Sequence, residues 1–145
     1  MYTESMQQVF GSADADMSSG GDTLLFAPAI PVEIVEFGYI ITTGLADAAG
    51  GMVIKCDKRP TAGSATDQGD GDLGSVTFTA AQVALATAGT KIGCRLKSPQ
   101  TVMPGEQASV DITTFPDSGA GIPYIVFRNK PTYRDNDDTL VLAED

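Results

Sequence analysis

The chain has 145 residues, the size of a single domain, and its 16 Gly and 8 Pro alongside many Thr and Val favour strands and turns over long helices. Its 19 Asp and Glu outnumber its 9 Lys and Arg, which gives a formal net charge of −10. Because such a surface repels phosphate backbones and anionic lipid, we expect neither nucleic acid nor a membrane as a partner.

Residues 1–21 show no sustained hydrophobic period, and the second half of this segment is rich in Ser, Asp and Gly. We predict a flexible N-terminal arm at 1–21, ahead of a β-sandwich domain at 22–145. The first ten residues carry apolar side chains that suit an arm ordering against a partner, although plain disorder explains them equally well. These candidate contact residues are Tyr2, Met6, Val9 and Phe10.

The start of the chain, Met1–Ser5, lacks the basic region and the apolar core of a signal peptide, so we expect synthesis in a cytosol without secretion. The longest apolar stretch, Val32–Ile41, is too short for a membrane span and is interrupted by Glu33 and Glu36. We therefore expect no membrane-spanning segment.

From Thr23 onward, short apolar runs separated by Gly, Pro and Asp clusters predict about eight strands. We place them at 23–27, 32–43, 52–57, 75–79, 91–97, 107–114, 122–128 and 138–143. The single helical candidate is Thr79–Ala88, with Thr79 as N-cap and Gly89 as the stop. The Pro104-Gly105 pair predicts a type II turn before the 107–114 strand.

The run Val32–Thr43 is apolar on both faces of a regular strand, with Ile34 and Ile40 on one face and Phe37 and Tyr39 on the other. Such a strand is either central in a sheet or has one face against a partner. We take Phe37 and Tyr39 as candidate interaction residues and this strand as the expected subunit interface.

No predicted helix is long enough for a βαβ crossover. The architecture that buries these strands is a two-sheet antiparallel β-sandwich, either jelly-roll or immunoglobulin-like, and the sequence leaves that choice open.

Alternation places Cys56 and Cys94 with the apolar faces of their strands. Buried free thiols are therefore expected, with a disulfide between facing strands as the alternative.

The absence of histidine excludes Ser–His and Cys–His nucleophilic pairs and the usual zinc sites. Asp67, Asp70 and Asp72 are spaced with Gly in one long loop, which makes them weak calcium candidates. The loop lacks the further ligands of an EF-hand, so a solvated loop is the preferred interpretation. We expect no enzyme and no cofactor.

The run Lys-Cys-Asp-Lys-Arg-Pro-Thr-Ala-Gly-Ser from Lys55, followed by Gly-Asp-Gly-Asp-Leu-Gly from Gly69, resembles small structural proteins of tailed bacteriophages. So does the pairing of Met-Pro-Gly-Glu from Met103 with Gly-Ala-Gly-Ile-Pro-Tyr from Gly119. Over about residues 32–128, the style and order of these runs resemble those of capsid decoration (cement) proteins. It implies a β-sandwich that binds the outside of an expanded head, often as a trimer or dimer, and reinforces joints between capsomers.

Three hypotheses follow. In the first, the chain is a virion protein assembled in the host cytoplasm, bound to the major capsid protein at the capsid surface and acting as a homo-oligomer. In the second, it is a carbohydrate-binding or adhesion module, which requires exposed aromatic residues such as Tyr39, Tyr124 and Tyr133 in a groove. In the third, calcium at Asp67–Asp72 stiffens a structural domain.

Overall fold

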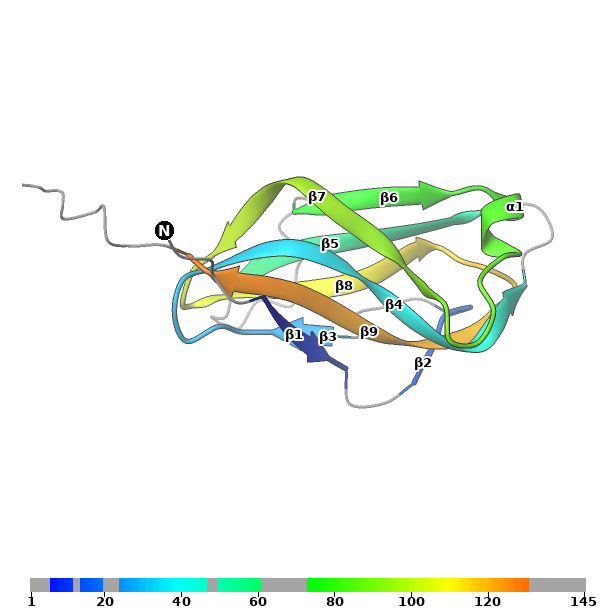
Figure 1. The fold of residues 1–145 in the computed structure, drawn as a ribbon, viewed down its shortest axis with the longest axis horizontal. Coiled ribbons are helices and arrows are strands. Elements are labelled where there is room, and N and C mark those ends of the chain that lie inside the picture. Colours follow the sequence, from blue (N-terminus) through cyan, green and yellow to red (C-terminus); the bar gives the residue numbers. More distant parts are fainter. Residues whose placement is uncertain (1–5, 12–13, 20–23, 47–49, 61–72, 131–145) are drawn as a thin grey trace, which may run out of the picture.

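A computed structural model describes residues 6–11, 14–19, 24–46, 50–60 and 73–130. In it the chain forms two antiparallel sheets packed face to face (Figure 1). The first sheet has the order β1 (Gln7–Phe10), β9 (Ser118–Asn129), β4 (Val32–Ala46), β7 (Lys91–Val102), with β2 (Ala15–Asp16) also paired to β9. The second has the order β3 (Leu24–Phe26), β8 (Glu106–Thr114), β5 (Met52–Pro60), β6 (Gly74–Phe78). The predicted all-β, two-sheet antiparallel sandwich is confirmed.

The core lies between the two sheets and is filled by apolar side chains from their inner faces. On β8 the apolar residues Ala108, Val110 and Ile112 are 0 to 2% exposed, and Ser109 between them is also buried. Facing and neighbouring core residues come chiefly from β4 and β5: Val32, Ile34, Phe37, Tyr39, Ile41, Met52, Ile54 and Cys56.

The central strand β4 changes register at a β-bulge between Ile34 and Glu36. A bulge adds one residue to one strand, so the side chains that follow exchange faces. Val32 and Ile34 before the bulge and Phe37 after it therefore all point into the same core. The prediction that this strand is central in a sheet is confirmed, because β4 lies between β9 and β7. The prediction of two opposite apolar faces was wrong because of the bulge, which leaves β4 with one core face.

The segment predicted as an arm contributes two strands to the first sheet. Val9 of β1 pairs with Ile125 of β9, and Ala15 of β2 pairs with Gly121 of the same strand. Val9 and Ala15 also pack against the core. This part of the arm is thus a portion of the sandwich, because β9 offers it both a backbone edge and an apolar surface.

The only helix among the described residues is α1 (Ala80–Val83), which begins where predicted and ends earlier than predicted. Its N-cap is Thr79, which forms a capping box with Gln82: Thr79 Oγ1 accepts from the Gln82 N–H at 3.3 Å, and the Thr79 N–H donates to Gln82 Oε1 at 2.8 Å. Beyond Val83, the carbonyl of Ala86 accepts a 2.9 Å hydrogen bond from the Leu45 N–H of β4, which draws the chain out of the helical path. The described residues contain no helix long and apolar enough to cross a membrane.

The turn from β7 to β8 has the geometry that its Pro-Gly pair predicts. Gly105 has a φ of 94°, and the Glu106 N–H donates to the Met103 carbonyl at 3.0 Å. The two cysteines, which the sequence places on apolar faces, form no disulfide: Cys56 is buried and Cys94 is half-buried.

Candidate functional site

A polar cluster lies on the outer face of the first sheet, over β4, β7 and β9. It forms because the β4 bulge directs Glu36 away from the core while its neighbour Phe37 points inward. Glu36 is opposite Arg95 on β7, and two residues along β4, Gly38 is opposite Gly93 on β7 and Tyr124 on β9. One carboxylate is thereby surrounded by groups from three strands.

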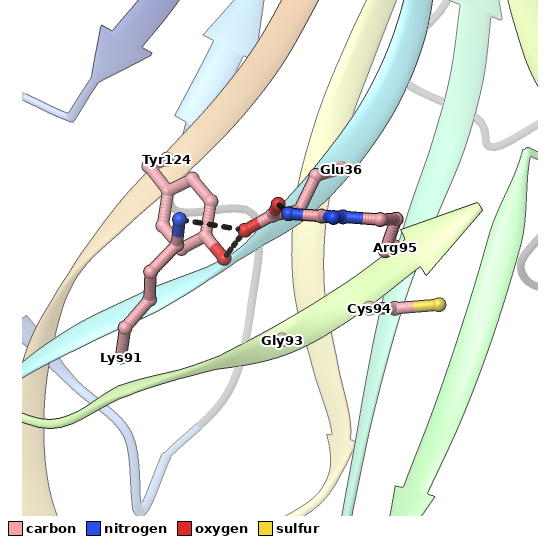
Figure 2. Close-up of a pocket in the computed structure, with 6 residues that line it drawn as sticks. All are labelled: Glu36, Lys91, Gly93, Cys94, Arg95 and Tyr124. Atoms are coloured by element: carbon pink, nitrogen blue, oxygen red, sulfur yellow. Dashed lines mark hydrogen bonds and ion pairs between the residues drawn. The ribbon is translucent and has the colours of Figure 1, made fainter.

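Glu36 accepts polar contacts from three side chains (Figure 2). The Tyr124 hydroxyl donates to Oε2 at 2.6 Å, and Lys91 Nζ is 2.8 Å from the same oxygen. Arg95 Nη2 is 3.3 Å from Oε1. Lys91 Nζ also lies 4.9 Å from the centre of the Tyr124 ring, within the range of a cation–π contact.

Two glycines make room for the tyrosine. A Cβ on Gly93 would lie 2.8 Å from the Tyr124 hydroxyl oxygen and 2.3 Å from the Phe37 carbonyl oxygen. A Cβ on Gly38 would lie 2.2 Å from the Ile92 carbonyl oxygen. The close approach of β4 and β7 at this pair therefore lets Tyr124 reach from β9 across β4, where it is only 1% exposed.

The environment shifts the pKa values of three groups. Burial acts to raise the pKa of Glu36, but the hydrogen bonds from Lys91 and Tyr124, the charge of Lys91 and the contact with Arg95 together hold it below its usual value. The pKa of Tyr124 is raised by burial and by its bond to Glu36. The pKa of the Cys94 thiol is raised by burial and by the nearby charge of Glu36. At neutral pH the cluster thus contains an ionised Glu36, a neutral Tyr124 and a protonated Cys94.

An open pocket of about 320 Å³ adjoins the cluster and is lined by Glu36, Lys91, Gly93, Cys94, Arg95 and Tyr124 (Figure 2). Glu36 is covered by its partners, whereas the Lys91 side chain is 46% exposed and that of Arg95 is 83% exposed. The pocket therefore presents two cations to solvent over one carboxylate that is already hydrogen-bonded. Such a surface suits an anionic group better than a cation.

The residues predicted to contact a partner fall into four groups. Met6 and Phe10 are exposed at 56% and 46%. Val9 is half-buried against the core, and Tyr2 lies outside the described residues. Phe37 and Tyr39 are fully buried, which corrects the expectation that they form a surface for a partner.

The calcium and sugar-binding hypotheses depend in part on residues that lie outside the described part of the chain. Asp67, Asp70 and Asp72 lie outside the described residues, and within those residues no group of three His, Cys, Asp or Glu is placed to hold a metal. A sugar-stacking groove needs exposed aromatic faces, but Tyr39 is 0% and Tyr124 1% exposed. Tyr133 lies outside the described residues.

Sequence reasoning missed the Glu36 cluster. A glutamate inside the longest apolar run is the signal that was available, because a strand with a charged residue between buried ones needs a partner for that charge. The partners themselves, Lys91 and Tyr124, are supplied by strands distant in sequence.

No protein-family model matches this chain, and no curated protein matches it. Among solved structures, the chain is similar to a chain of the "Cyanophage Pam1 capsid asymmetric unit" at 14% sequence identity and a TM-score of 0.47, over 90% of this chain and 89% of that chain. What this chain does is therefore inferred from its own residues.

Proposed function

We propose that this chain is a non-enzymatic structural protein of a bacteriophage particle, which binds the outer surface of the capsid and bridges capsomers as a homo-oligomer. The proposal follows from the resemblance of the runs at Lys55, Gly69, Met103 and Gly119 to capsid decoration proteins. The partner would be the major capsid protein, and assembly would take place in the host cytoplasm.

The observation that carries the bridging part of the proposal is the distribution of exposed apolar side chains along the sandwich. Ile30 and Met103 are 50% and 45% exposed near the end where Val32 pairs with Val102. Leu85 and Phe115 are 75% and 42% exposed near the opposite end, where Ala46 pairs with Ser118. Apolar contacts at both ends of one molecule suit a protein that joins two neighbours.

The edge strand β1 adds a third apolar element, since Met6 and Phe10 expose their side chains beside the β1–β9 pair. Each contact buries little area, so binding would depend on many identical sites on a shell. Because occupied sites stabilise only the assembled state, the shell would resist disruption more strongly as sites fill.

The test is cosedimentation of the purified protein with expanded heads that lack it. We expect the wild-type protein to sediment with heads and the variant Met6→Ser/Phe10→Ser to bind at least about tenfold more weakly, a loss of about 1.4 kcal/mol. The matched control Gln7→Ser/Gln8→Ser changes polar, exposed positions of the same strand and should bind like the wild type. Absence of wild-type protein from the head pellet would contradict the proposal.

A further inference from the structure

The outer strand β7 presents an open backbone edge from Lys91 to Arg95. Among the described residues, no strand pairs with β7 on the side away from β4. The Ile41 N–H donates to the Thr90 carbonyl at 2.8 Å, which makes 41 and 90 a hydrogen-bonding position of the β4–β7 ladder. In an antiparallel ladder such positions alternate, so the N–H and C=O groups of Lys91, Gly93 and Arg95 face the open edge.

The side chains along this edge give it a charge opposite to that of the whole protein. Lys91 and Arg95 lie on the outer face on either side of Gly93; their charged groups reach Glu36 of β4, and both side chains remain partly open to solvent, at 46% and 83% exposure (Figure 2). The chain as a whole has a net charge of −10. Two exposed cations and one covered carboxylate, Glu36, therefore form a locally basic strip on an acidic molecule.

The spacing of the strip defines what fits it. On a paired strand, residues opposite Lys91 and Arg95 are four positions apart and lie on one face. A residue midway between them would lie beside Gly93, which has no side chain to meet it. The complementary partner is an extended segment with Asp or Glu at positions 1 and 5 and a small or medium side chain at position 3.

We propose that the Lys91–Arg95 edge of β7 binds an extended acidic segment of another protein by strand addition. Backbone pairing along the edge supplies affinity, and Lys91 and Arg95 select carboxylates at the stated spacing. The inference rests on the proposed function in one respect only: the proposed function is what identifies the partner as another protein of the phage particle. The binding itself is a property of this chain.

Cations on an edge strand also discourage edge-to-edge aggregation, and this simpler role predicts no ligand. The two are separated with the labelled peptide acetyl-Thr-Asp-Val-Thr-Val-Asp-Thr-amide, in which the acidic residues are four apart. The control acetyl-Thr-Thr-Asp-Val-Val-Asp-Thr-amide has the same composition, but its acidic residues are three apart and point to opposite faces. A single-stranded oligonucleotide serves as a polyanion without a peptide backbone.

We expect fluorescence anisotropy to show binding of the first peptide and at least about tenfold weaker binding of the second. Arg95→Gln and Lys91→Gln should each weaken binding of the first peptide about tenfold. Lys97→Gln makes the same charge change at an exposed β7 position, where β7 departs from its regular pairing with β4, and should leave binding within about twofold of wild type. In amide NMR spectra, the peptide should shift Lys91, Gly93 and Arg95 most.

Equal affinity for both peptides, tighter binding of the oligonucleotide, or no binding of the first peptide would each overturn the inference. Retained peptide binding in Arg95→Gln, checked to be folded by circular dichroism, would do the same. If heads still bind the protein while the peptide does not, the proposed function stands and the β7 site fails. If the peptide binds and heads do not bind the protein, the β7 site stands and the proposed function fails.

Discussion

The Tyr124 hydroxyl of β9 donates a 2.6 Å hydrogen bond to Glu36 Oε2 of β4, on the side of the first sheet opposite the core. The bond lies at the centre of a contact between three strands, because Lys91 of β7 meets the same oxygen at 2.8 Å. The outer face of the sheet is therefore held together by side chains as well as by its backbone ladder.

Removal of the Tyr124 hydroxyl should destabilise the fold. Tyr124→Phe leaves the ring in place but removes the hydroxyl that donates a hydrogen bond to Glu36, from a side chain only 1% exposed. We expect a loss of about 1.5–3 kcal/mol in the free energy of unfolding. Urea unfolding of Tyr124→Phe, Glu36→Gln and the double variant measures the coupling. A coupling energy below about 0.5 kcal/mol would show that the two groups act independently.

Acidification should weaken the same cluster. The pKa of Glu36 is lower in the folded chain than its ordinary value of 4.5, so the folded state binds fewer protons than the unfolded state in the range between the two values. The stabilisation from ionised Glu36 is present above pH 4.5 and is lost as the pH falls through the folded-state pKa. In the range between the folded-state pKa and pH 4.5, plots of unfolding free energy against pH should be less steep for Glu36→Gln than for the wild type, and identical slopes in that range would contradict the assignment.

A methyl group at Gly38 should be poorly tolerated. Its Cβ would meet the Ile92 carbonyl oxygen at 2.2 Å, so β4 and β7 would have to separate. We expect Gly38→Ala to lower the free energy of unfolding by about 2–4 kcal/mol. The control Gly44→Ala, on the same strand, has its nearest neighbour at 3.7 Å and should change stability by less than about 0.5 kcal/mol, as measured by thermal and urea unfolding.

Deletion of Val35 should be far more damaging than its substitution. Without the additional residue of the bulge, either Ile34 or Phe37 must leave the core, since both are 0% exposed and lie on opposite sides of the irregularity. We expect the deletion variant to lack dispersed amide NMR signals. Val35→Ala preserves the residue count and should retain a native spectrum. A dispersed spectrum from the deletion variant would show that β4 can shift its register.

Strand positions were largely predictable where apolar side chains recur at every second residue. On β8 these are Ala108, Val110 and Ile112, which all lie in the core. The β4 bulge was not predictable in this way, since Val35 has no residue type that marks an irregular backbone. Because of this one additional residue, the sequence pattern of β4 matched that of a strand with two apolar faces, although β4 has a single core face.

The candidate site was unpredictable for a different reason. Glu36 and Tyr124 are 88 positions apart, and only the strand order that places β9 next to β4 brings them together. Local pattern assigns neither residue a partner. The pairing of β1 was unpredictable in the same way, because Val9 acquires its neighbour Ile125 from the far end of the described chain.

Both ladder partners of β4, β7 and β9, come later in the chain than β4 itself. During synthesis, this long apolar strand leaves the ribosome before either partner has been made. The first sheet therefore cannot form until β9 has emerged, while β5 can already pair with β6 and then with β8. Long-range pairing of this kind folds slowly, so a nascent chain stalled before β9 would expose β4 and need protection from aggregation.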